Sequence, residues 1–176
     1  MPWIDDLQKF LQTKFTGDVS LITLHWTVGT HDQIFADDYH FQITGDGRIW
    51  VDPRAFDQYG NFVPLAHAWH HNSRNLGIAV CGMLGAMEPI LWTPKDLYTF
   101  PSSYGTDSPT KAQMDTLCTL VSALCRHYRI SFDKVKTHYE LALEDGYAGE
   151  RWEYKYEKPL IMKEVDRIYE STKPIY

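Results

Sequence analysis

Short apolar runs bounded by turn residues recur along this chain, and they restrict its fold more than any other feature of the sequence. Residues 20–26 and 76–83 are apolar runs of the kind that form buried strands, and a short strand is expected over 135–138. Residues 38–44 and 48–51 flank a Gly-Asp-Gly turn, which is typical of a β-hairpin. The chain is therefore expected to contain a β-sheet that includes an antiparallel pair.

Amphipathic segments separate and flank these strands. Apolar residues spaced three and four apart predict helices over residues 3–14, 110–129 and 158–172. The middle helix is the best defined, because Thr110 and Gln113 predict a capping box at its first turn. Strands that alternate with helices, and that also include a hairpin, favour a central mixed β-sheet flanked by helices, an α/β (α+β mixed) fold.

Length, charge and apolar content narrow the class of protein. The 176 residues suffice for one domain with a hydrophobic core, and no internal linker divides residues 1–176. The net charge of -6 argues against a nucleic-acid partner, because such proteins usually carry a basic surface. No run approaches the ~18 apolar residues of a membrane span, so we expect no membrane insertion. The N-terminal residues carry no basic leader or cleavage site, so we expect synthesis in the cytoplasm without a signal peptide.

The cysteines favour neither a disulfide framework nor a Cys-rich zinc knuckle. Their number, three, is odd, and no Cys-x-x-Cys pair occurs. Cys118 and Cys125 lie seven positions apart on the predicted middle helix. We expect them on its buried face, where they would act as small hydrophobic residues.

Two histidines stand where predicted strands end. His25 closes the strand over 20–26, and His138 closes the strand over 135–138. A single histidine at such a place is more often a hydrogen-bonded structural residue. Two of them, however, can converge on one ion, because neighbouring strands lie ~5 Å apart. Catalytic zinc sites use three protein ligands, and spacing alone does not choose the third among the carboxylates that follow. These carboxylates are Glu140, Glu144, Asp145, Glu150 and Glu153.

Several motifs, taken in order, resemble one known family. They are LHWTVG, DYHFQITGDGRIWV, AHAWHHNSRNLGIAVCGM, PTKAQMDTLCTLVSALCRHYRI and THYELALEDGYAGERWEY. The set resembles the zinc-dependent N-acetylmuramoyl-L-alanine amidases of type 2, which include phage amidase lysozymes and peptidoglycan recognition proteins. The resemblance covers about residues 20–155. It implies a fold like that of the peptidoglycan recognition proteins, with the helices over 3–14 and 158–172 packed on it.

The resemblance also implies a set of site residues. His25, His138 and Glu153 fall on the positions that hold Zn²⁺ in the family, with Glu153 in place of the usual Asp or Cys. Asp145 is the reserve choice for the third ligand. Arg151 stands where the family has a lysine, and Tyr39 falls on the family's tyrosine. Arginine keeps the positive charge but does not donate a proton usefully at neutral pH.

The resemblance implies weaker roles for some residues outside this set. His67 and Asn72 fall near the substrate groove of the family, although a plain surface loop is an equal reading. Three aromatic residues in the long loop before the middle helix could form a groove wall for sugar rings or could anchor the loop. These residues are Trp92, Tyr98 and Tyr104.

The expected activity is hydrolysis of the amide bond between N-acetylmuramic acid and L-alanine in bacterial peptidoglycan. The substrate would be the glycan strand with its stem peptide, and the protein is expected to be a monomer. Glu140 could supply the proton to the leaving amine, but the favoured reading is a carboxylate that either supports a metal ligand or starts a helix. We expect a phage-type endolysin that reaches the cell wall after release or delivery. The alternatives are a non-catalytic peptidoglycan-recognition module and a cytosolic wall-recycling amidase acting on soluble anhydro-muropeptides.

Overall fold

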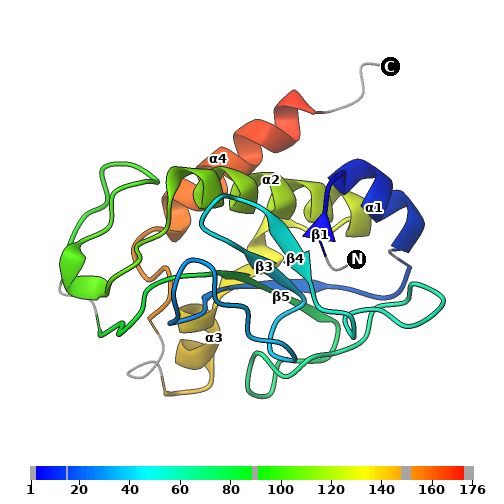
Figure 1. Ribbon diagram of the computed structural model, residues 1–176, viewed down its shortest axis with the longest axis horizontal. Helices are drawn as coiled ribbons and strands as arrows, with labels where there is room; N and C mark the ends of the chain where they lie inside the picture. The colour runs from blue at the N-terminus through cyan, green and yellow to red at the C-terminus, as the bar shows by residue number, and fades with distance from the viewer. Residues whose placement is uncertain (1–2, 15, 89–90, 148–151, 173–176) are drawn as a thin grey trace.

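A computed structural model describes residues 3–14, 16–88, 91–147 and 152–172 (Figure 1). Within these described residues, six strands form one mixed sheet in the order β1-β4-β3-β5-β2-β6. β3, β5, β2 and β6 pair in parallel, whereas β4 is antiparallel to both β3 and β1. The strands are β1 (Trp3–Ile4), β2 (Leu21–Trp26), β3 (Phe41–Ile43), β4 (Ile49–Val51), β5 (Asn75–Val80) and β6 (Val135–Thr137). The predicted mixed sheet is confirmed, and β3 and β4 form its hairpin.

Helices cover both faces of this sheet. Figure 1 shows α2 and α4 together on one face and α3 on the other. None of the helices in the described part of the chain is long and apolar enough to cross a membrane. The α-helices are α1 (Leu7–Lys14), α2 (Lys111–Tyr128), α3 (His138–Glu144) and α4 (Lys158–Ser171), and the described ranges also contain the short 3₁₀ helices η1 (Ser102–Tyr104) and η2 (Phe132–Lys134).

Helix α2 begins at the predicted capping box. The Gln113 backbone N–H donates to Thr110 Oγ1 at 3.1 Å, and the Thr110 backbone N–H donates to Gln113 Oε1 at 2.9 Å. The same glutamine amide also donates to the carbonyls of Ile43 and Cys81. These bonds fix the start of α2 against the ends of β3 and β5.

The three cysteines are buried, as expected for Cys118 and Cys125. Burial raises the pKa of each thiol to about 12, so all three are neutral at physiological pH. They therefore pack as small hydrophobic side chains, with no thiolate available for chemistry.

Two local predictions need correction. The first helix does not start at residue 3, because Trp3 and Ile4 pair with β4 and the Asp6 carboxylate caps α1 by accepting the Lys9 backbone N–H at 3.0 Å. His138 does not close a strand but is the first residue of α3. Thr137 and Glu140 form a capping box there, which ends β6 and begins α3 within one residue.

Candidate metal centre

His25 and His138 lie next to each other at one end of the parallel strands. β2 and β6 pair in parallel with Leu24 opposite Thr137, so the residues that follow are His25 and His138. The two ring centroids are 4.6 Å apart, and the two Nδ1 atoms are 3.1 Å apart. The expectation that the two imidazoles converge is therefore met, although His138 reaches the site from the first turn of a helix.

Glu153 approaches this pair from the segment between α3 and α4. Its Oε1 lies 3.2 Å from His138 Nδ1, and both side chains are almost fully buried. The next residue, Tyr154, has a backbone φ of 55° and is completely buried against Trp26. The Tyr154 hydroxyl donates to the His25 backbone carbonyl at 3.1 Å, which ties the Glu153 segment to β2.

The geometry of these three residues fits a zinc ion. Tetrahedral zinc with bonds of ~2.0 Å holds its ligand atoms roughly 3.3 Å apart. The His25–His138 and His138–Glu153 separations of 3.1 Å and 3.2 Å are close to this value. Across the described residues, no other group of three His, Cys, Asp or Glu ligands comes together in this way.

A second observation supports the fit. Glu153 Oε2 is buried and has no hydrogen-bond partner among the described residues. An unpaired carboxylate oxygen away from water is costly, and a bound cation removes that cost. Two imidazoles and one carboxylate are a donor set that catalytic zinc uses.

His67 lies directly behind His25. Its Nδ1 is 3.1 Å from His25 Nε2, and its Nε2 is 3.0 Å from the Asn75 carbonyl oxygen. Burial lowers the pKa of His67 to about 4, so the ring is neutral at neutral pH. Asn72 Oδ1 accepts the backbone N–H groups of His67 and Ala68, which shapes the loop that carries this histidine.

A cavity of about 250 Å³ opens beside His138, one of the three converging residues. Its walls include His67, Asn72 and His138, together with Trp69 and Tyr147. The two residues expected near the substrate groove therefore share a cavity with a candidate metal ligand. Their contact with substrate stays a prediction.

The remaining candidates fall in different places. The half-buried Tyr39 ring lies 5.0 Å from the His25 ring, centroid to centroid. Arg151 lies outside the described residues. Asp145 is absent from the converging group, and its Oδ1 lies 3.2 Å from His71 Nε2. Glu140 caps α3 and accepts Lys158 Nζ at 2.7 Å, in keeping with the favoured reading of a helix-start carboxylate.

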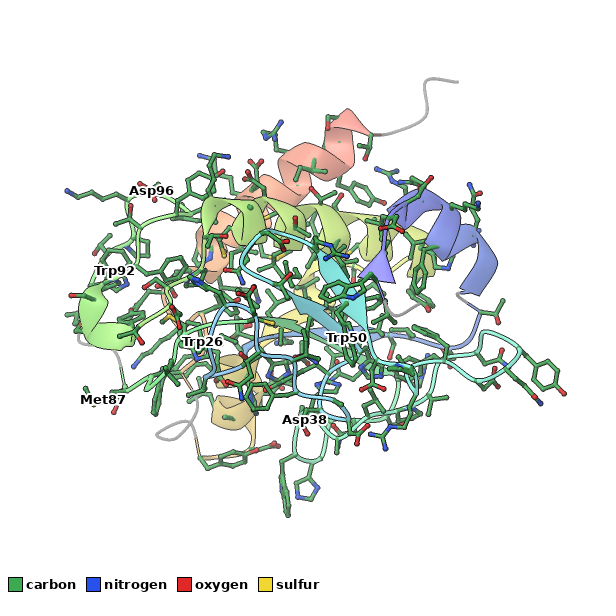
Figure 2. All side chains as sticks on the ribbon, in the orientation of Figure 1. Trp26, Asp38, Trp50, Met87, Trp92 and Asp96 are labelled. Atoms are coloured by element: carbon green, nitrogen blue, oxygen red, sulfur yellow. The ribbon has the colours of Figure 1, made fainter. Side chains whose placement is uncertain are left out.

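The aromatic residues of the long loop serve as anchors. Trp92 Nε1 donates to Glu157 at 3.2 Å, and the Tyr98 hydroxyl donates to Asp115 at 2.8 Å. Tyr104 is buried against Trp92. Figure 2 shows Trp92 on this loop, with Met87 at an earlier point of the same loop. These contacts favour anchoring over a groove wall.

Sequence reasoning missed two residues around the candidate ligands. It did not connect His67 with His25, because the two are 42 residues apart and nothing in either motif indicates the pairing. It also passed over Tyr154, for which the sequence offers no signal beyond its place after Glu153.

The sheet and the converging side chains thus define an α/β domain with a candidate mononuclear metal site. A family model described as N-acetylmuramoyl-L-alanine amidase matches residues 15–152, and the chain belongs to this family. The match ends at Trp152, so the place of Glu153 in the site depends on the geometry described above. A comparison with curated protein sequences found no match.

Two solved structures with TM-scores of at least 0.50 share this fold. The catalytic domain of XlyA is similar at a TM-score of 0.52 and 13% identity, over 86% of this chain and 87% of that one. A mutant endolysin from Bacillus subtilis is similar at a TM-score of 0.50 and 14% identity, over 86% of each chain. A Drosophila peptidoglycan recognition protein, SA, has a TM-score of 0.44 and 15% identity, over 71% of this chain and 70% of that one. The expected mixed α/β fold is confirmed.

Proposed function

We propose that this protein is a zinc-dependent amidase that hydrolyses the bond between N-acetylmuramic acid and L-alanine in bacterial peptidoglycan. One observation carries the proposal. In a chain of the amidase family, the ligand atoms of His25, His138 and Glu153 lie within 4.8 Å of one another. We take residues 1–176 as one catalytic domain that works as a monomer on the glycan strand and its stem peptide.

The three residues would hold Zn²⁺ through two bare imidazole nitrogens and one ionised carboxylate. When bound there, zinc supplies Lewis-acid polarisation of the scissile carbonyl and lowers the pKa of a water towards ~7. His25, His138 and Glu153 are buried, which limits the access of bulk water to their side chains. A drier site strengthens every electrostatic interaction with the developing charge.

Two further residues are proposed to act on the reacting atoms. Tyr39, whose ring lies against His25, would orient the attacking water or donate a proton through its hydroxyl. A phenol hydroxyl is in general a better proton donor than base. Arg151, two positions before Glu153, would stabilise the negative charge that develops on the amide oxygen.

The substrate would lie in the cavity beside the ligands. His67 and Asn72 on one wall, with Trp69 and Tyr147, are proposed to contact it there. The opening beside His138 would let the scissile amide reach the ligand set, while the rest of the glycan and peptide stays outside.

We further propose an endolysin role, since structures of similar fold include an endolysin from Bacillus subtilis.

One alternative function has the same fold but no hydrolytic activity. Glu153 and Arg151 both depart from the family's usual residues, which favours a recognition module that binds peptidoglycan without cutting it. A wall-recycling amidase would instead cut soluble anhydro-muropeptides and spare intact sacculi.

Mass spectrometry of digested peptidoglycan tests the proposal. Purified sacculi and soluble muropeptides are incubated with the protein, with the chelated protein, and with chelated protein given zinc again. The proposal predicts free L-alanine amino termini and intact lactyl groups from sacculi, lost on chelation and restored by zinc. Intact muropeptides after long incubation with zinc would support the recognition module, and cutting of soluble muropeptides alone would support the recycling enzyme.

A further inference from the structure

We propose that His67 is a positioning residue that sets the tautomer and orientation of His25, so that His25 presents a bare Nδ1 to the metal. This inference rests on the proposed zinc site but adds a role that neither the family match nor the ligand set assigns. The relevant atom is Nε2 of His25, which contacts His67, whereas Nδ1 of the same ring faces His138.

The Asn75 carbonyl determines where the His67 ring carries its proton. A carbonyl oxygen only accepts, so His67 Nε2, at 3.0 Å from it, must carry the proton of that ring. A neutral imidazole has one N–H, and His67 Nδ1 is therefore bare. His25 Nε2 lies 3.1 Å from this bare nitrogen and must in turn be the donor. His25 Nδ1 is left without a proton, and it is the atom that faces His138 Nδ1.

His67 is itself held on two sides. Asn72 Oδ1 accepts the His67 backbone N–H at 3.0 Å, which fixes the start of its loop. The ring lies over Gly77 of β5, where a Cβ atom would come within 2.6 Å of His67 Cγ. A glycine at this position thus makes room for the ring directly behind His25, and His67 is almost fully buried there.

Metal-bound histidines usually donate their second ring N–H to a fixed acceptor, and this acceptor sets the ligand's tautomer and orientation. In this chain the acceptor is a second histidine. Without it, the Nε2–H of His25 would lose the His67 acceptor, and the opposite tautomer, which cannot bind zinc through Nδ1, would no longer be disfavoured by this contact. Loss of such a partner typically weakens metal binding about 10- to 100-fold.

Zinc affinity of two matched variants tests the proposal. His67→Leu fills the same space with an apolar side chain that offers no acceptor. His67→Asn instead places an amide oxygen close to the position of the His67 Nδ1 atom. Affinity is measured by competition with a chromophoric chelator. We expect about a 10- to 100-fold loss in His67→Leu and a much smaller loss in His67→Asn. Equal affinity of the wild-type protein and His67→Leu would overturn the proposal.

A spectroscopic readout on the unmodified protein keeps the test independent of folding defects. Long-range ¹H–¹⁵N NMR of the zinc-loaded protein reports which nitrogen of each ring carries a proton. The proposal requires a proton on Nε2 of both His25 and His67, and zinc on His25 Nδ1. A proton on His25 Nδ1 would refute it while leaving the zinc site intact. A wild-type protein that binds no zinc at all would instead contradict the proposed function itself.

Discussion

Tyr39 shows how much of the proposed chemistry depends on a single polar atom. Its ring lies against His25, so removal of the hydroxyl alone leaves this packing in place. We predict that Tyr39→Phe lowers kcat about 100-fold, because a positioned proton donor contributes on this order. Zinc content should not change. Release of L-alanine amino termini measures kcat, and unchanged turnover would assign the tyrosine a structural role only.

His40 makes stability depend on pH. It is fully buried, donates through Nε2 to the Val63 carbonyl and accepts the Gly77 backbone N–H on Nδ1. Burial, with a smaller effect of the neighbouring His67, lowers the pKa of His40 to about 3. The unfolded chain takes up this proton near its ordinary value of ~6.5. Stability contributed by the neutral ring is therefore present above that value and is lost as the pH falls towards 3.

Denaturant titrations of the metal-free protein check this effect. Between pH 7 and pH 5, His40 should account for a loss of about 2 kcal/mol in the free energy of unfolding. In His40→Gln, the loss over the same interval should be smaller by about that amount. The same pH dependence in both proteins would show that His40 is not the cause.

Among the elements, the segment from Glu153 to Tyr154 links the third candidate ligand to the first. The Tyr154 hydroxyl donates to the His25 carbonyl, and its ring packs on Trp26. We predict that Tyr154→Phe lowers the free energy of unfolding by about 1 kcal/mol, the net value of one hydrogen bond. We also expect weaker zinc binding, because the ligand segment is then less well held.

Tyr59→Phe is the matched control, because Tyr59 is strongly exposed and lies outside the site. Denaturant unfolding with and without zinc, and chelator competition, are measured on both variants. If Tyr154→Phe behaves like Tyr59→Phe in both measurements, the link between the Glu153 segment and β2 has no energetic role.

The elements differ in how well the sequence predicts them. α2 was predicted to within one residue at each end, because eighteen residues repeat the helical period and a capping box marks the start. α3 was not predicted with bounds, since seven residues give too few repeats to reveal a period, and only the favoured reading of Glu140 indicated a helix start there. The sequence nonetheless contains its capping box, because Thr137 and Glu140 form a Thr-x-x-Glu motif. This motif could have indicated a helix beginning at His138.

For the whole molecule, local patterns predicted a mixed sheet but not the strand order β1-β4-β3-β5-β2-β6. Strand pairing is non-local, and β2 lies between two strands that come much later in the chain. The same limit applies to the candidate site. Strand ends pointed to His25 and His138, but only the family resemblance singled out Glu153. The contact of His67 with His25 depends on how the 66–72 loop folds back over β5, which no local pattern encodes.

The central claim is that Glu153 completes a zinc site with His25 and His138. Zinc bound per chain after dialysis, measured by mass spectrometry of the metal, tests it in Glu153→Gln and in Asp145→Asn, the reserve ligand. We predict about one zinc in the wild-type protein and in Asp145→Asn. Glu153→Gln, which keeps its shape but not its charge, should remain folded and hold far less. Full zinc in Glu153→Gln, or its loss in Asp145→Asn, would contradict the account.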